Sequence, residues 1–171
     1  RYANDAQWLR DIWEGAACPL VVDADALNML ADASDFARWP RRNRPTVLTP
    51  HPGEMARLTG MPVAEVQRDR IGVALRYAAD TGATVALKGA YTVIATPEGE
   101  AYINPTGNAG MAKGGSGDAL AGIIAALLAQ GRTAEQAACL GVYRHGEAGD
   151  RAVKARPSIG SLLASDLIEH L

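Results

Sequence analysis

The chain has 171 residues, of which 48% are hydrophobic and 21% charged, which suits one folded domain with a substantial core. Its 17 basic and 19 acidic side chains give a formal net charge of −2, so charge offers no reason to expect nucleic acid or an anionic membrane as a partner. The basic run at residues 38–44 is short and lies close to two prolines, and we interpret it as a solvated loop.

Cysteine usage and hydropathy predict a compartment. Cys18 and Cys139 lack metal-ligand spacing and lie among apolar residues, so we expect two buried free thiols in a reducing environment. No apolar run approaches the roughly 18 residues of a membrane span, and no basic-then-apolar leader opens the chain. We therefore expect a cytoplasmic protein. Because Arg1 opens the chain within a helix-like stretch, we also expect an upstream segment that this sequence does not include.

Helix and strand alternate through the first half of the chain. Helical spacing of apolar residues predicts helices, and glycines such as Gly60 and Gly82 predict where two of them end. Short apolar runs that end in polar residues predict buried strands. On these grounds we expect helices at residues 5–14, 26–33 and 62–82, a short helix that follows Pro52 and Gly53 and is closed by Gly60, and strands at 19–25, 45–50 and 83–89.

Helices dominate the second half. Residues 91–105 contain Pro-Glu-Gly between two short apolar stretches, which predicts a β-hairpin. A glycine-rich segment follows, and apolar residues then predict a strongly hydrophobic helix at 118–131. We expect two further helices, at 133–153 and at 158–171, the last with Ser158 as its N-cap.

This order of elements predicts an α/β fold over residues 1–171, with a mostly parallel sheet flanked by helices on both faces. Ligands of such folds gather at the carboxyl ends of the strands. The expected strand ends carry Asp23 and Asp25, then residues 49–54, then residues 88–92. Polar side chains therefore fall where a binding site is expected.

The segment "GNAGMAKGGSGDALAG" fits neither common nucleotide motif. The dinucleotide fingerprint fails because Leu120 stands at its third glycine position, and the P-loop fails because Lys113 is followed by another glycine. What remains is "GGSGD" running into a helix, where backbone N–H groups and the positive end of the helix dipole can converge on one anion. The predicted anion hole consists of Gly115, Ser116 and Gly117.

Asp118 begins the expected helix, and two roles are open for it. An Asp in the first turn commonly caps the helix or complements its dipole. Alternatively, it acts as a general base beside the bound phosphate and deprotonates an attacking hydroxyl, since phosphoryl transfer needs positioning, charge neutralisation and little else. The residues favour the second role without deciding it.

"GNAGMAKGGSGDALAGIIAALLAQG" resembles the ADP/ATP-dependent NAD(P)H-hydrate dehydratases, a branch of the ribokinase-like superfamily. "VVDADALN", "LTPHPGEMARLTG", "VALKGAYTVIATPEG" and "HGEAGD" are similar to that family's other blocks, in the same order. The resemblance covers essentially the whole chain. It also implies that the domain is N-terminally incomplete, because family members carry a preceding part with the first strands of the sheet.

The resemblance implies repair of damaged nicotinamide cofactors. Such enzymes use ADP or ATP, with Mg2+, to remove the water added across a ring double bond of NADH or NADPH. The ring hydroxyl is phosphorylated, and phosphate then leaves as the double bond re-forms. The resemblance further implies a homo-oligomer, in some members an upstream epimerase domain, and no nucleic-acid or membrane partner.

The resemblance also implies roles for individual residues. Asp118 would be the catalytic base and contact the substrate, and His51 would contact the hydrated ring. Glu54, three residues after His51, would help to hold Mg2+ through water, although His51 stands where the superfamily has Asn. The nucleotide-binding residues would be Lys88, Gly89, Ala90, Tyr91, Thr92 and Gly117.

Structural roles remain open for three of these residues. Lys88 at a strand end also suits a solvated charge, and His51 before a proline also suits a structural role. Glu54 also suits an acid that complements a helix dipole.

The sequence leaves other polar residues without a definite site role. Asp23, Asp25 and Asn28 suit structural hydrogen bonds and substrate contact equally. We interpret residues 104–108 as a turn and His145 as a packing or capping residue.

Two functional alternatives remain. A vitamin or sugar kinase of the same superfamily would phosphorylate its substrate and stop, whereas an inert nucleotide-binding fragment would bind without turnover. "TPHPGE" beside "KGAYT" favours the dehydratase.

Overall fold

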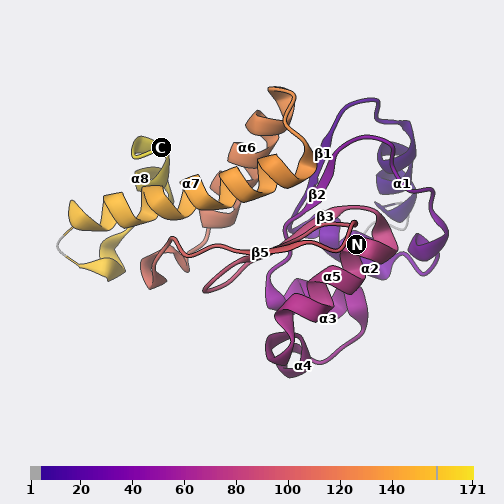
Figure 1. The fold of residues 1–171 in the computed structure, drawn as a ribbon, viewed down its shortest axis with the longest axis horizontal. Coiled ribbons are helices and arrows are strands. Elements are labelled where there is room, and N and C mark those ends of the chain that lie inside the picture. Colours follow the sequence, from indigo (N-terminus) through magenta and orange to yellow (C-terminus); the bar gives the residue numbers. More distant parts are fainter. Residues whose placement is uncertain (1–4, 157) are drawn as a thin grey trace.

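The computed structural model describes residues 5–156 and 158–171, and within them one sheet of five strands. Strands β1 to β3 run parallel, and β4 and β5 form an antiparallel hairpin on β3 (Figure 1). The predicted mostly parallel sheet and the predicted hairpin are therefore confirmed. The strands, which neighbour one another in chain order, are β1 (Leu20–Val22), β2 (Thr46–Leu48), β3 (Thr84–Leu87), β4 (Val93–Ala95) and β5 (Ala101–Ile103).

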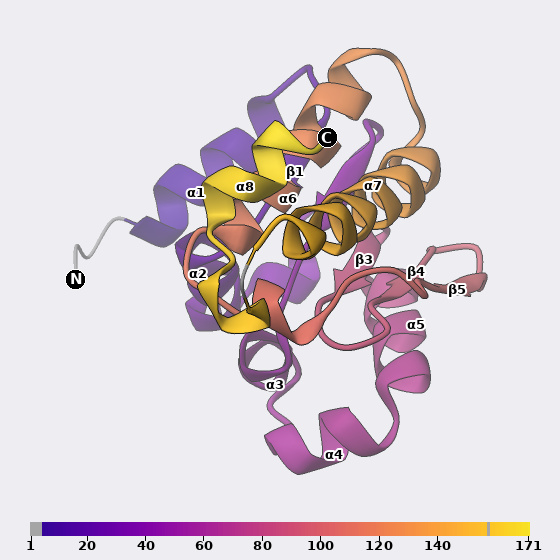
Figure 2. The ribbon, with the colours of Figure 1, turned by 90° about the vertical axis from the view of Figure 1, so that its left-hand side faces the viewer.

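Helices cover both faces of the sheet, as expected (Figures 1 and 2). Three short 3-10 turns, at Phe36–Arg38, Ala109–Met111 and Ile159–Ser161, connect the elements. The α-helices are α1 (Asp5–Gly15), α2 (Asp25–Asp32), α3 (Pro52–Thr59), α4 (Val63–Arg68), α5 (Arg70–Thr81), α6 (Ser116–Ala129), α7 (Ala134–Lys154) and α8 (Ala164–Glu169).

The alternation of side chains along each strand divides the core in two. Leu48 and Val85 point into one cluster with residues of α1 to α5, and their neighbours Val47 and Ala86 point into another with residues of α6 and α7. Successive strand residues face opposite sides of a sheet, so nearly continuous apolar strands are needed when both sides are covered. This explains why β2 and β3 are apolar at every position after the threonine that begins each of them.

Two expected helices differ from the structure. The helix expected at 62–82 is broken at Asp69, whose carboxylate accepts the N–H of Gly72 at 2.9 Å and so starts α5. The helix expected at 158–171 is wrong in its first part, which is a 3-10 turn, and the side chain of Ser158 makes no capping bond. Helix α8 begins later because Asp166 accepts the N–H of Leu163 at 2.8 Å.

One expectation about exposure is wrong, and another, the solvated basic run, holds for Arg38, Arg41 and Arg44 but not for Arg42. Cys18 is exposed because it lies in the connection after α1 rather than on an apolar face, while Cys139 is half-buried. Within the basic run, Arg42 is not a solvated side chain, because its guanidinium donates to backbone carbonyls at the end of α1, including those of Ala16 and Cys18. Across the described residues, none of the helices combines the length and apolar character needed to cross a membrane.

Candidate active site

A cavity of about 1070 Å³ lies at the carboxyl ends of β1, β2 and β3. Every residue that the sequence predicted for the site lines this cavity, although the residues come from separate segments of the chain. The lining includes Asp23, His51, Glu54, residues 88–92, residues 104–109, residues 111–118, His145 and Gly146. The fold thus brings the predicted residues together, while their roles stay predictions.

Residues 114–117 form a turn that we term the glycine turn. It leads into α6, which begins at Ser116, two residues earlier than expected. Gly115 is the N-cap residue with a φ of 86°, in the left-handed region that favours glycine. The N–H of Ser116 already donates to the carbonyl of Lys113, so it is not free for an anion. Among the described residues, however, the N–H groups of Gly117 and Asp118 have no acceptor, as is usual in a first helical turn. The N–H of Gly115 likewise has no acceptor among the described residues, so the geometry allows an anion hole at Gly115, Gly117 and Asp118.

Asp118 is exposed and faces the cavity. No side chain caps α6, so Asp118 does not act as the capping residue that one interpretation allowed. Within the described chain its carboxylate has neither a hydrogen bond nor an ion pair. A carboxylate held at the positive end of a long apolar helix, with no protein partner, can accept a proton from a bound ligand.

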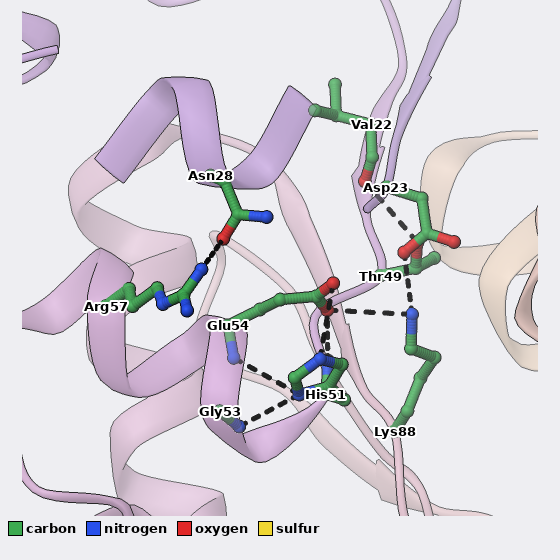
Figure 3. A network of polar contacts seen from close by, with 9 residues as sticks. All are labelled: Val22, Asp23, Asn28, Thr49, His51, Gly53, Glu54, Arg57 and Lys88. Carbon is green, nitrogen blue, oxygen red and sulfur yellow. Dashed lines mark hydrogen bonds and ion pairs between the residues drawn. The ribbon is translucent and has the colours of Figure 1, made fainter. Parts of the chain in front are cut away.

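Lys88 forms the centre of a charged cluster (Figure 3). Its ammonium lies 2.6 Å from Asp23 Oδ1 and 3.8 Å from Glu54 Oε2, and all three side chains are at most 20% exposed. A Cβ on Gly117 would lie 3.7 Å from both Lys88 Nζ and Asp23 Oδ2, so the cluster touches the glycine turn. Lys88 is therefore an ion-paired residue beside the anion hole rather than a solvated charge.

His51 has a structural task that the sequence left open. Its Nδ1 accepts the N–H groups of Gly53 at 3.0 Å and Glu54 at 3.2 Å, and Glu54 accepts the N–H of His51 at 2.7 Å, which forms a capping box at the start of α3. Because Nδ1 is an acceptor, the imidazole proton is on Nε2. Nε2 lies 3.4 Å from Glu54 Oε1, and the ring is 56% exposed and lines the cavity, so a ligand can reach the imidazole.

Asp25 and Asn28 do not line the cavity. Asn28 accepts from the guanidinium of Arg57 at 2.6 Å, and Asp25 begins α2. Of the acidic and amide side chains after β1, only Asp23 enters the site.

Residues 104–108, interpreted from the sequence as a turn, are held against α7 and form one wall of the cavity. Asp150 accepts the N–H of Gly107 and the side-chain amide of Asn108, each at 2.9 Å. A Cβ on Gly146 would lie 2.2 Å from Thr106, so only glycine permits this contact. Glycine inside a helix is costly, so a glycine kept there usually marks a place where another segment comes close to the helix backbone. The glycines of "HGEAGD" were such a signal in the sequence.

His145 lies in the middle of α7, buried, with Nε2 3.3 Å from the hydroxyl of Ser116. Of the two roles expected for His145, packing and capping, the structure shows packing. The side chain also contacts the glycine turn. Burial lowers the pKa of His145, although the contact with Ser116 opposes that shift. The imidazole is consequently neutral at neutral pH.

This shift predicts that the chain loses stability as the pH falls below the ordinary histidine pKa of 6.5. There the unfolded chain binds a proton that the folded chain does not, so the free energy of unfolding falls by up to about 1.4 kcal/mol per pH unit. Denaturant titrations of the wild type and His145→Gln between neutral pH and mild acid measure the effect. A shallower decline is expected for the variant, and identical slopes would contradict the assignment.

Helices cover both faces of the sheet, and the glycine turn is followed at once by Asp118 in the first turn of α6. With the structural relatives below, these features place the chain in the ribokinase-like class. A solved ribokinase-like superfamily protein from Enterococcus faecalis V583 is 29% identical with a TM-score of 0.74, over 99% of this chain and 60% of that one. A hydroxyethylthiazole kinase from Pyrococcus horikoshii OT3, at 15% identity and a TM-score of 0.62, over 96% of this chain and 74% of that one, shares the fold.

Residues 3–171 match the family model described as NAD(P)H-hydrate dehydratase, and the chain belongs to that family. It is 54% identical over 153 residues to a bifunctional NAD(P)H-hydrate repair enzyme from Moorella thermoacetica, which covers 90% of this chain and 28% of that protein. It is 46% identical over 149 residues to an ADP-dependent (S)-NAD(P)H-hydrate dehydratase from Neisseria meningitidis, which covers 87% of this chain and 50% of that protein.

A crystal structure of the ADP/ATP-dependent NAD(P)H-hydrate dehydratase from Bacillus subtilis, co-crystallized with ATP/Mg2+, is similar to this fold. It has 40% sequence identity and a TM-score of 0.79, over 90% of this chain and 52% of that one. The chain spans 28% of the Moorella protein and about half of the Neisseria and Bacillus dehydratases.

Proposed function

We propose that the chain carries the dehydratase site of its family, with ADP or ATP as phosphoryl donor and hydrated NADH or NADPH as substrate. The observation that carries the proposal is the position of Asp118, a carboxylate without a partner among the described residues, beside free backbone N–H groups and the Lys88 cluster in one cavity. The activities for which the relatives are named support the same reaction.

In this mechanism Asp118 takes the proton of the ring hydroxyl, whose oxygen attacks the terminal phosphorus of the nucleotide and displaces AMP from ADP, or ADP from ATP. The N–H groups of Gly117 and Asp118 and the positive end of α6 stabilise the transferred phosphoryl group. Phosphate then leaves with the former hydroxyl oxygen, and loss of a proton from the neighbouring ring carbon restores the double bond. Phosphorylation matters because hydroxide is a much poorer leaving group than phosphate.

Residues 88–92 would contact the nucleotide, and His51 would contact the hydrated ring through Nε2. Asp23 and Glu54 both line the cavity and would offer carboxylate oxygens to Mg2+, which binds through one or two carboxylates plus phosphate oxygens and waters. The ion would neutralise phosphate charge when bound. A homo-oligomer, an upstream epimerase domain and a cytoplasmic location belong to this proposal as well.

Incubation of the chain with hydrated NADH, ADP or ATP, and Mg2+ tests the proposal. Recovery of the near-ultraviolet absorbance of the dihydronicotinamide ring is expected. Nucleotide consumption on a thiazole alcohol or a sugar, without that recovery, would instead indicate a kinase. Nucleotide binding without any turnover would indicate an inert fragment.

Two variants of His51 separate its structural task from its proposed contact with substrate. His51→Ala removes the cap of α3 and is expected to cost about 1 kcal/mol of stability, whereas His51→Asn keeps a capping oxygen and most of that stability. Both are expected to raise the KM for hydrated NADH more than the KM for the nucleotide. Steady-state kinetics and denaturant titration measure both effects, and an equal rise in the two KM values would count against the substrate contact.

A further inference from the structure

Residues 88–91 form a loop after β3, which we term the nucleotide loop. Arg70, the first residue of α5, bonds to the residue that precedes this loop, Leu87, and to Ala90 within it. Its Nη1 donates to the carbonyl of Ala90 at 2.6 Å, and its Nη2 donates to the carbonyl of Leu87 at 2.9 Å. A single guanidinium therefore bridges the end of β3 and the far side of the loop. The break in the helix at Asp69 is what starts α5 at this residue.

The nucleotide loop has a backbone that needs such support. Tyr91 has a φ of 56°, and besides Ala24 it is the only non-glycine residue with a positive φ in the described chain. A left-handed conformation costs such a residue free energy, so surrounding contacts must hold it. Gly89 has a φ of 149°, which other residues rarely adopt, and a Cβ there would also press on Arg70 Nη2 at 2.9 Å.

The bonds from Arg70 orient the peptide groups of the nucleotide loop. In a trans peptide the C=O and N–H point in opposite directions, so the Ala90 carbonyl that faces Arg70 turns the N–H of Tyr91 away from it. The loop lines the large cavity, whereas Arg70 lines a separate depression of about 280 Å³. In the part of the chain that the structure describes, the N–H groups of Gly89, Ala90 and Tyr91 have no acceptor. Successive free N–H groups of this kind bind anions.

The arrangement is costly for a purely structural contact. Nε of Arg70 is buried and has no hydrogen-bond partner among the described atoms. Burial of an unpaired donor is unfavourable, so the two carbonyl bonds must be worth more to the protein than that penalty. Orientation of a binding loop supplies a reason to keep a charged group here.

We propose that Arg70 is a positioning residue for nucleotide binding, which fixes the nucleotide loop so that its free N–H groups face the phosphates. The inference rests on the proposed function only in that the loop binds ADP or ATP. Arg70 does not line the large cavity, and it acts through the backbone of residues 87–90.

Calorimetric titration of ADP with Mg2+ into the 171-residue chain tests this inference. Arg70→Ala is expected to weaken ADP binding by about tenfold or more, since bonds from a charged donor are the stronger ones. Arg70→Lys is expected to recover only part of the loss, because one ammonium cannot reproduce the fork of a guanidinium. Methylguanidinium, added below denaturing concentrations, is expected to restore part of the affinity of Arg70→Ala but not of the wild type.

Arg41→Ala is the matched control. Arg41 Nη2 donates to the carbonyl of Ala79 at 2.7 Å and to that of Asp80 at 3.4 Å, at the other end of α5 and away from the cavity. This variant removes the same kind of bond and is expected to leave ADP affinity unchanged. Thermal unfolding of all variants shows whether each one folds before its affinity is compared.

An Arg70→Ala chain that folds and binds ADP as tightly as the wild type would overturn the inference. The inference would be supported if the wild type binds ADP and Arg70→Ala loses that binding. This holds even if the chain does not dehydrate hydrated NADH, because that result would refute only the proposed function. Failure of the wild type to bind ADP would overturn both.

Discussion

The Asp118→Asn variant is expected to lose turnover of hydrated NADH by about 100- to 10,000-fold, the range typical for removal of a general base. Asn keeps the size of the side chain but cannot take the proton of the ring hydroxyl. The carboxylate has no hydrogen bond or ion pair within the described residues, so the free energy of unfolding should hardly change. Single-turnover rates with saturating nucleotide measure the loss, and calorimetry measures ADP affinity, which should stay within about threefold of the wild type.

Glu65→Gln is the control for this variant. Glu65 is an exposed acid in the first turn of α4, outside the cavity, so it shares the dipole position of Asp118 but not the site. Near-normal activity is expected for this control. If Asp118→Asn were as active as Glu65→Gln, Asp118 would be only a dipole partner of its helix.

Lys88→Met is expected to impair both stability and nucleotide binding. Met keeps most of the volume, but the substitution leaves Asp23 and Glu54 facing each other without a cation. We expect a loss of about 2–3 kcal/mol of unfolding free energy, below the roughly 3–5 kcal/mol of a fully buried pair because the three side chains keep some exposure. We also expect ADP affinity to fall by about tenfold or more, since a phosphate contact is lost.

A double variant separates these two effects. Asp23→Asn in the Lys88→Met background removes one unpaired carboxylate and should restore much of the stability, measured by denaturant titration. It should not restore ADP affinity. Recovery of both would mean that Lys88 serves only as a counter-ion. Lys154→Met, an exposed position in the last turn of α7, controls for loss of a surface charge.

Local signals in the sequence predicted much of the fold. Gly60 and Gly82 end their helices with φ values of 70° and 72°, as their positions indicated. Such signals are reliable because the backbone conformation of one residue decides them. The break at Asp69 was missed because the apolar spacing of the helical face continues across it, while the capping bond to Gly72 interrupts the helix.

The identity of the candidate site residues also came from the sequence, through the motifs around His51, Lys88 and Asp118. The contacts that these residues make could not be predicted from the sequence. The motif could not show that Lys88 bonds Asp23, 65 residues away, or that Asp150 holds Gly107, 43 residues away. Nor did any motif indicate Arg70, which lies within an expected helix. Contacts between distant segments depend on how strands and helices pack. That packing cannot be read from the residues that neighbour a given residue in the chain.

The sequence by itself determined the α/β class, the family resemblance and the glycine turn that begins α6, because periodicity, glycine position and motif order are local properties. Only the tertiary structure decided that Ser116 uses its N–H within the turn, that Asp118 has no partner among residues 5–156 and 158–171, and that Lys88 is paired with two carboxylates. The physical reason is that hydrogen bonds and ion pairs form wherever the packed sheet brings donors and acceptors within reach. The parallel strands bring their carboxyl ends to one edge, and that edge turns scattered motifs into one cavity.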